Sequence, residues 1–167
     1  MMISDIKALI QPMLEESTIT EVEDFGDIFA IHFTNNKYYE SKRFEDMEVG
    51  AGPIIFIKES KAIFHTGSGR TASEYVAAYR NCGDVFGLLG KNIKIYELPK
   101  DVDKKLCILR LKKILGYNLR DAKNIVEKME FKEAIEIKLK DEWHARNVLA
   151  NLLDAGFLAK HIWDKSN

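Results

Sequence analysis

The chain has 167 residues, enough for one medium domain or two small ones. Its composition, 46% hydrophobic and 31% charged, is that of an ordinary globular protein and excludes a disordered or low-complexity chain. Because no run of roughly 18 apolar residues occurs, the sequence also excludes a membrane-spanning helix.

The N-terminal segment predicts an amphipathic helix. Apolar residues recur at helical spacing between Ile3 and Glu16, and Ser4 is expected to cap this helix. Pro12 predicts a kink or an early end, because proline lacks the backbone donor that a helix interior needs. The segment has neither the basic start nor the small-residue cleavage site of a signal peptide, so we expect a cytoplasmic protein.

Apolar and alternating runs predict a four-stranded antiparallel sheet after this helix. The run from 53 to 58 is the most hydrophobic in the chain and is predicted to be a central strand. Asparagine tolerates positive φ, so Asn35-Asn36 is expected to turn the chain between two strands of a hairpin. The acidic residues 21–27 are expected to form an exposed strand end and turn. The four predicted strands span residues 28–33, 37–44, 53–58 and 62–65.

A capped helix ends the first half of the chain. Thr71 followed by Glu74 is a capping-box pair, which predicts a short helix that continues to Tyr79 or Arg80. The element order of this half is therefore α-β-β-β-β-α.

This half resembles the YrhB-like immunity protein family (immunity protein family 35). The resemblance covers roughly residues 3–80 and depends on the strand Gly52–Lys58, the following strand with His65, the loop Gly67-Ser-Gly69, and a helix with Glu74-Tyr75 and Tyr79. The family's usual turn between the two strands is shortened here to Lys58-Glu-Ser-Lys61. The resemblance implies a small cytoplasmic bacterial protein of a polymorphic toxin system, which neutralises a toxin by binding it.

Three glycines in residues 83–92 predict a connector between a domain of residues 1–82 and a domain of residues 93–167. The charge balance changes sign there: residues 1–92 hold 9 basic and 14 acidic residues, whereas residues 93–167 hold 16 and 12. This change supports a domain boundary. Neither half is basic enough to predict nucleic-acid binding on charge alone.

The second half contains a helix–turn–helix unit between Asp103 and Met129. Gly116 is expected to end the first helix in the left-handed conformation, and Asn118 is expected to cap the second. The flanking segments add three strands, at residues 92–98, 133–139 and 160–163, and a helix at residues 141–155. The predicted order is β-α-α-β-α-β, which makes the whole chain an α+β protein of two small domains.

This second half resembles the C-terminal domain of the bacterial ribosomal stalk protein over residues 93–163. The matching motifs are Leu119–Glu127 after the Gly116 turn and Leu153–Gly156 before the last strand. The resemblance implies that a basic surface on the first two helices docks translation factors. Lys104, Lys112 and Lys123 fall at matching basic positions, whereas Leu109 replaces a lysine of the family and has Arg110 beside it.

No motif in the sequence indicates catalysis, a metal or a cofactor. The four histidines are scattered without a second ligand at metal spacing, and Gly67-Ser-Gly-Arg70 lacks the spacing of a nucleotide-binding loop. The two cysteines, Cys82 and Cys107, form no CxxC pair and are expected to be reduced thiols of a cytoplasmic protein. We therefore expect no enzymatic activity and no cofactor.

Protein binding is the function that the sequence favours, and it has two alternative forms. In the first, an acidic cluster flanked by tyrosines binds a cognate toxin; in the second, the basic helices bind a ribosomal or GTPase factor. Each set of charges is also explained by a solvated surface, and the oligomeric state is not specified. The candidate partner-binding residues are Glu21, Glu23, Asp24, Asp27, Tyr38 and Tyr39 for the first form and Lys104, Lys112 and Lys123 for the second.

Overall fold

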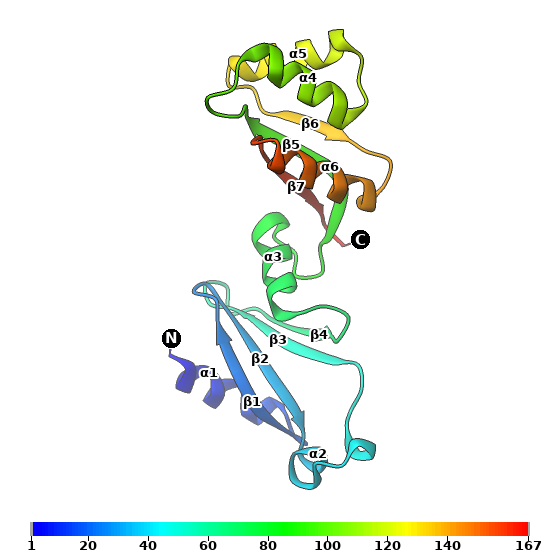
Figure 1. Cartoon of the computed structure of the whole chain (residues 1–167). Coiled ribbons are helices and arrows are strands. Elements are labelled where there is room, and N and C mark those ends of the chain that lie inside the picture. The colour runs from blue at the N-terminus through cyan, green and yellow to red at the C-terminus, as the bar shows by residue number, and fades with distance from the viewer. Residues whose placement is uncertain (1, 167) are drawn as a thin grey trace. The chain divides into compact units, whose positions relative to one another are not determined.

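The computed structural model describes residues 2–166 and contains two compact units, which divide between Gly87 and Leu88. The described residues form six α-helices and two antiparallel sheets of four and three strands (Figure 1). This architecture confirms the predicted class, an α+β fold of two small domains. Among the described residues, no helix combines the length and the apolar character needed to span a bilayer.

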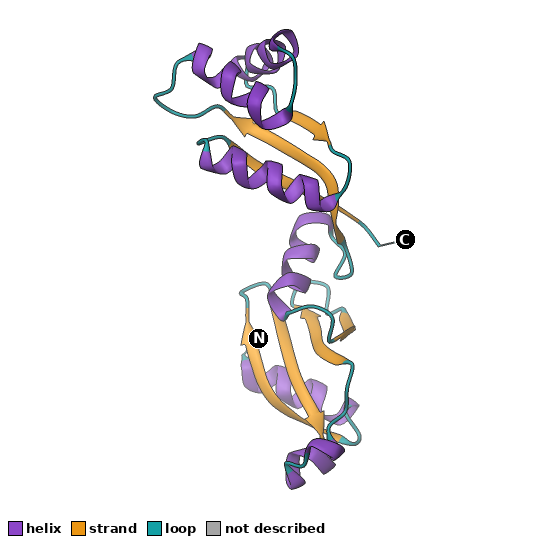
Figure 2. Cartoon of the chain, turned by 45° about the vertical axis from the view of Figure 1, so that its right-hand side comes forward, coloured by secondary structure: helices purple, strands orange, loops and turns teal. Residues whose placement is uncertain are grey.

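The first unit is a four-stranded sheet with a helix on each face (Figure 2). Its strands follow one another in the sheet in the order β1-β2-β3-β4. Its elements are α1 (Ile3–Ile10), a 3-10 turn η1 (Gln11–Met13), β1 (Ser17–Asp24), β2 (Ile28–Asn35), α2 (Asn36–Ser41), a 3-10 turn η2 (Phe44–Asp46), β3 (Ala51–Ile57), β4 (Ile63–Gly67) and α3 (Ala72–Cys82).

The two flanking helices of this unit follow their local signals, with one exception. α1 ends at Ile10 and Pro12 lies in the 3-10 turn, which confirms the predicted early end. Ser4 does not cap α1, because the helix begins one residue before it and the Met2 amide donates to Asp5 Oδ2 at 2.9 Å. The predicted capping box of α3 is present: the Thr71 amide donates to Glu74 Oε2 at 2.8 Å.

Residues 37–44 were predicted to be a strand, and this prediction is wrong. Asn35 does not turn a hairpin; its side-chain oxygen accepts the Tyr38 amide at 2.7 Å and caps α2. Lys42, at φ 55°, ends that helix in the left-handed conformation. The hairpin partner of β2 is instead β1, which includes most of the acidic residues assigned to a strand end and turn.

β2 and β3 are buried on both faces, which explains their continuous apolar runs. On one face, Phe29 and Phe56 pack with Ile6 and Ile10 of α1. On the opposite face, residues 28, 30, 55 and 57 pack with Tyr75 and Val76 of α3. α3 packs only on this part of the second face; Glu21 and His32, which pair further along β1 and β2, lie outside that core.

The second unit is a three-stranded sheet in the order β6-β5-β7, with its helices packed on one face. The predicted order β-α-α-β-α-β is confirmed, and residues 88–92, assigned to the connector, form the start of β5. Its elements are β5 (Leu88–Glu97), α4 (Lys104–Leu115), α5 (Leu119–Glu130), β6 (Ile135–Lys138), α6 (Glu142–Asp154) and β7 (Leu158–Asp164).

The helix–turn–helix unit has the predicted caps. Gly116 ends α4 at φ 69°, and the Asn118 side chain accepts the Asp121 amide at 2.9 Å. The core beneath these helices includes residues of all three strands and of each helix. Its strand residues are Ile93 and Ile95 of β5, Ile137 of β6 and Ala159 of β7. Cys107 is part of this core, and burial raises the pKa of its thiol.

Gly52 generates the first testable prediction. A Cβ at this position would lie 2.2 Å from the Gly67 carbonyl oxygen on the paired strand, so β3 and β4 would have to separate. Gly52→Ala should destabilise the first unit by about 1–3 kcal/mol, the usual cost of overpacking. Gly69→Ala is the control, because a Cβ there meets no atom within 4 Å.

Urea unfolding followed by far-ultraviolet circular dichroism measures this effect. Both tryptophans, Trp143 and Trp163, lie in the second unit, so tryptophan fluorescence monitors that unit separately. Equal circular-dichroism transitions for the Gly52 and Gly69 variants would contradict the prediction.

His161 generates the second prediction, on pH. It is 9% exposed, and its Nε2 has no hydrogen-bond partner in the described part of the chain. Burial, and then Arg146, hold the pKa of His161 below its usual value, whereas Glu142 acts in the opposite direction. The unfolded chain therefore binds the proton more readily, and the second unit should lose stability as the pH falls below about 6.5.

The measurement is urea unfolding by tryptophan fluorescence between pH 8 and pH 5. His161→Leu should remove much of the pH dependence in that window, and the same change at exposed His144 should leave it in place. Identical pH profiles for the unaltered chain and the His161 variant would disprove the assignment.

Candidate partner-binding surfaces

The predicted acidic cluster lies at one end of the β1–β2 hairpin, and most of it is paired. Glu23 Oε1 lies 2.6 Å from His32 Nε2, and Lys58 Nζ donates to Asp24 Oδ1 at 2.5 Å. Arg80 of α3 contacts Asp27 Oδ1 at 2.5 Å. Of the four predicted carboxylates, only the exposed Glu21 has no ion pair within the described chain. The cluster therefore offers a partner less negative charge than its sequence indicates.

These ion pairs perturb the carboxylates in the expected direction. The Lys58 ammonium lowers the pKa of Asp24, and the Arg80 guanidinium lowers the pKa of Asp27. Arg80 also donates to the Phe25 carbonyl, so it connects α3 to the β1–β2 turn. We assign these residues a structural role at the turn.

The sequence predicts that Tyr38 and Tyr39 flank the acidic cluster, and this prediction is wrong. Both lie on α2, which follows the opposite end of β2 (Figure 1). The eight residues of β2 separate the two sites by roughly 25 Å of extended chain. Tyr38 is half-buried and Tyr39 is 46% exposed.

An exposed apolar surface occupies the segment from α2 to the start of β3. Phe44 is 82% exposed and Val49 is 83% exposed, which is unusual for such large apolar side chains in one short segment. We call this surface the α2–η2 surface; its apolar side chains are Tyr39, Phe44, Met47 and Val49.

Asp46 holds the α2–η2 surface in place. Its carboxylate accepts hydrogen bonds from Lys37 Nζ at 2.6 Å and from Ser41 Oγ at 2.8 Å, and its backbone carbonyl accepts from Asn35 Nδ2 at 2.9 Å. Lys37, and then Ser41, lower the pKa of Asp46. Because these contacts fix Asp46, which directly precedes Met47 and follows Phe44 by two residues, the loop that presents the apolar side chains is held to α2 and the end of β2.

The charges around this surface are mainly acidic. Glu40, Glu45 and Glu48 are exposed there. The three nearby basic residues are occupied locally: Lys37 pairs with Asp46, Arg43 pairs with Glu45, and Lys42 lies 4.2 Å from the centre of the Tyr39 ring. This combination suits a partner that has an apolar pocket within a basic surface.

Phe44, Met47 and Val49 were not among the residues predicted to bind a partner, although the sequence contains one signal for them. These apolar residues recur in a segment that has neither the period of a strand nor that of a helix. Assigning residues 37–44 to a strand placed Phe44 at a strand end and hid this signal.

The basic residues predicted on the second unit are partly neutralised. Lys104 Nζ lies 2.7 Å from Glu130 and 3.6 Å from Glu127, and Lys123 Nζ lies 3.7 Å from Glu127. Glu130 raises the pKa of Lys104. The structure thus brings Lys104 and Lys123 together at Glu127, whereas Lys112 lies in the last turn of α4.

The outer surface of α4 and α5 also contains exposed leucines. Leu106 is 40% exposed, Leu109 is 48% exposed and Leu119 is 55% exposed. Leu109 occupies a position where the stalk-protein resemblance calls for a lysine. This surface is therefore more apolar than the resemblance implies.

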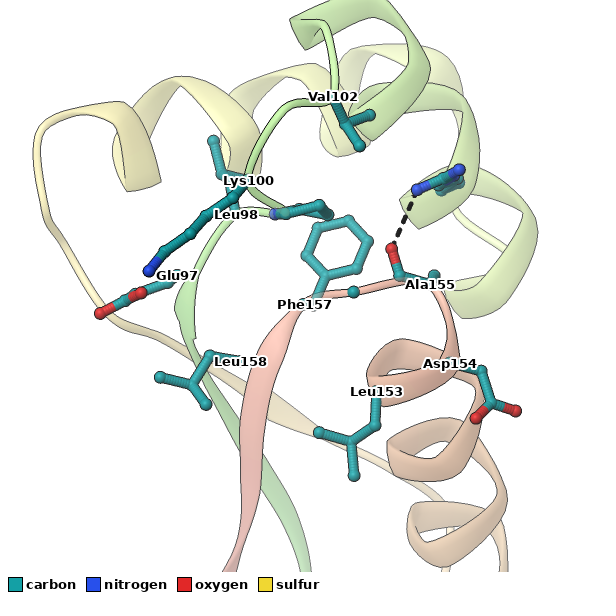
Figure 3. A pocket seen from close by; sticks show the side chains of 12 residues that line it. Glu97, Leu98, Lys100, Val102, Leu153, Asp154, Ala155, Phe157 and Leu158 are labelled. Atoms are coloured by element: carbon teal, nitrogen blue, oxygen red, sulfur yellow. Dashed lines mark hydrogen bonds between the residues drawn. The ribbon is translucent and has the colours of Figure 1, made fainter.

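A hollow of about 670 Å³ lies where the end of α6 meets the loop before α4 (Figure 3). The buried Phe157 ring is at its centre, with Leu98 and Val102 beside it and the half-exposed Leu153 and Leu158 at its rim. Arg110 donates to the Ala155 carbonyl at 2.9 Å and thereby closes the end of α6. The apolar lining suits an apolar side chain of a protein partner.

Within the described residues, no group of three histidines, cysteines or carboxylates is placed to hold a metal ion. No protein-family model matches this chain, and no curated protein or solved structure matches it significantly. The two family resemblances therefore depend on the motifs quoted above.

The role of Asp46 generates a third prediction. Asp46→Ala removes the acceptor of Lys37 and Ser41, so amide hydrogen exchange in residues 41–49 should become faster, while exchange in β2 and β3 stays unchanged. Glu45→Ala is the control, since Glu45 contacts neither Lys37 nor Ser41 among the interactions of the described residues. Unchanged exchange in the Asp46 variant would contradict its role in holding the surface.

Proposed function

We propose that this chain is a non-enzymatic, protein-binding protein of the immunity type, which neutralises a cognate bacterial toxin through its α2–η2 surface. The observation that carries the proposal is the pair of highly exposed side chains, Phe44 and Val49, on a loop held by Asp46. The resemblance of residues 3–80 to the YrhB-like immunity family supports the same function.

The physical argument concerns the cost of binding. An aromatic side chain on an ordered loop loses little conformational entropy when a partner covers it, so most of its apolar burial contributes to affinity. Phe44 and Met47 are residue types enriched in the centres of protein interfaces. The exposed carboxylates Glu40 and Glu48 add attraction to a basic partner, and many toxins that act on nucleic acid are basic near their active sites.

The proposed principal interface is the α2–η2 surface and not the acidic cluster, although both belong to the first unit. The sequence predicts this interface at the acidic cluster, but Asp24 and Asp27 are paired with Lys58 and Arg80. Paired carboxylates must give up an existing partner before they bind a new one. The α2–η2 surface requires no such exchange at its apolar positions.

A fourth prediction tests the proposal. The gene next to that of this protein should encode a product that harms the cell when it is expressed alone, and co-expression of this protein should restore growth. Phe44→Asp combined with Val49→Asp should weaken toxin binding by roughly 30-fold or more, as for an interface hot spot, and should reduce the rescue.

Phe131→Asp is the matched control, because Phe131 of the second unit is 86% exposed and lies outside the proposed surface. Full rescue by the double variant at Phe44 and Val49 would place the interface elsewhere. Failure of the unaltered protein to rescue would remove the immunity function for that pair.

A second candidate function is a translation-associated adaptor that docks a ribosomal or GTPase factor through α4 and α5. The observation that favours it is the group of exposed leucines beside Lys112 on these helices. Charge reversal at Lys104, Lys112 and Lys123 should abolish factor binding in this case, whereas toxin rescue should survive it. The two functions are therefore separable with one set of variants.

A further inference from the structure

The sheet of the second unit has one face without core residues. Successive strand residues point to opposite faces, so the buried Ile93, Ile95 and Ile137 place their neighbours along each strand on the other face. In Figures 1 and 2 this sheet is the one formed by β5, β6 and β7. We call this the open sheet face; its polar and aromatic residues are Asn92, Lys94, Tyr96, Glu136, Lys138 and Lys160.

Two lysines lie directly opposite each other on this face. The register of β5 and β7 pairs Lys94 with Lys160. Like charges at directly opposite positions of a sheet are destabilising, whereas Glu136, opposite Lys94 on β6, acts in the stabilising direction; Lys160 has no such carboxylate opposite it. Lys94, Lys138 and Lys160 also have no ion pair within the described chain, in contrast to Lys104 and Lys123 on the helices.

Tyr96 lies beside both lysines. The centre of its ring is 5.7 Å from Lys94 Nζ and 5.2 Å from Lys160 Nζ. The ring also lines a hollow of about 490 Å³ at the end of the sheet, together with Leu98, Met129 and Lys132. The site therefore combines an aromatic ring, an adjoining hollow that Glu97 also lines, and three lysines, of which only Lys94 has a carboxylate, Glu136, opposite it in the sheet.

This combination fits one class of partner. We propose that the open sheet face binds single-stranded nucleic acid, with one base stacked on Tyr96 and the neighbouring phosphates contacted by Lys94, Lys160 and Lys138. Base–aromatic stacking tolerates any base, and lysines at this spacing satisfy backbone phosphates. Phosphates would also reduce the repulsion between Lys94 and Lys160, which Glu136, opposite Lys94 alone, offsets only in part.

The small net charge of the chain does not oppose this proposal. The formal charge of −1 is a sum over two units of opposite sign, whereas the open sheet face has three lysines against Glu136, which accepts from Asn92 Nδ2 at 2.9 Å. Local charge, not the sum, determines the counterions that a bound strand releases. The proposal is independent of toxin binding, since it uses a different unit.

The experiment is fluorescence anisotropy of the full chain with a fluorescein-labelled 12-nucleotide oligouridine at 50 mM and 200 mM salt. The unaltered protein should bind saturably at the lower salt and more weakly at the higher salt. Tyr96→Ala should weaken binding about tenfold, within the range known for loss of one stacked base. Lys94→Gln with Lys160→Gln should weaken it at least tenfold and reduce the dependence on salt.

Lys112→Gln with Lys113→Gln on α4 is the matched control and should change the affinity less than twofold. Lys160→Glu adds a test of the charge pair: it should weaken nucleic-acid binding and, at the same time, stabilise the second unit in tryptophan-monitored unfolding. A loss of binding that came from misfolding would instead lower that stability. An oligothymidine of equal length distinguishes RNA from DNA as the preferred strand.

Three results would overturn the proposal. One is no binding of either oligonucleotide at 50 mM salt. Another is binding that is insensitive to Tyr96→Ala and to the double change at Lys94 and Lys160. The third is uridine monophosphate binding as tightly as the 12-nucleotide strand, which would leave no role for successive phosphates.

Discussion

The number of sheet faces that helices cover determines where each unit can bind a partner. In the first unit, α1 and α3 bury opposite faces of the sheet, so Phe56 and Ile55 point into different cores. In the second unit, one core joins the sheet to all three helices, and the polar residues of β5, β6 and β7 occupy the other face. In the first unit the proposed recognition surface is a loop, whereas in the second unit one whole face of the sheet is free of core residues.

Pairing within the folded chain then decides which charged residues are available to a partner. Asp24 pairs with Lys58, Asp27 with Arg80 and Lys104 with Glu130, at distances of 2.5–2.7 Å. The pKa values of Asp24, Asp27 and Lys104 all shift in the direction that favours the charged form. Lys94 and Lys160 lie opposite each other and form no ion pair among the described residues, although Glu136 lies opposite Lys94 on β6. A residue's charge in the sequence is therefore a poor guide to the charge it offers to a partner.

Both proposed surfaces combine an aromatic side chain with charged residues that the fold leaves available. Phe44 shares its segment with the exposed Glu40 and Glu48, and Tyr96 lies near Lys94 and Lys160 on a sheet. The signs of these charges are opposite, which suits a basic protein in the first case and a polyanion in the second.

The sequence by itself determined the fold class, the element order of the second unit, and the local caps at Thr71, Gly116 and Asn118. These features depend on residues within a few positions of one another, where periodicity and capping act directly. Only the tertiary structure decided that β1, and not residues 37–44, pairs with β2, because the choice of strand partner is non-local; residues 36–41 form a helix instead. It also decided which charges are neutralised, since Asp27 and Arg80 are 53 residues apart in the chain. Tyr39 was predictable as an interface residue, but Phe44 and the Lys94–Lys160 pair required the loop geometry and the strand register.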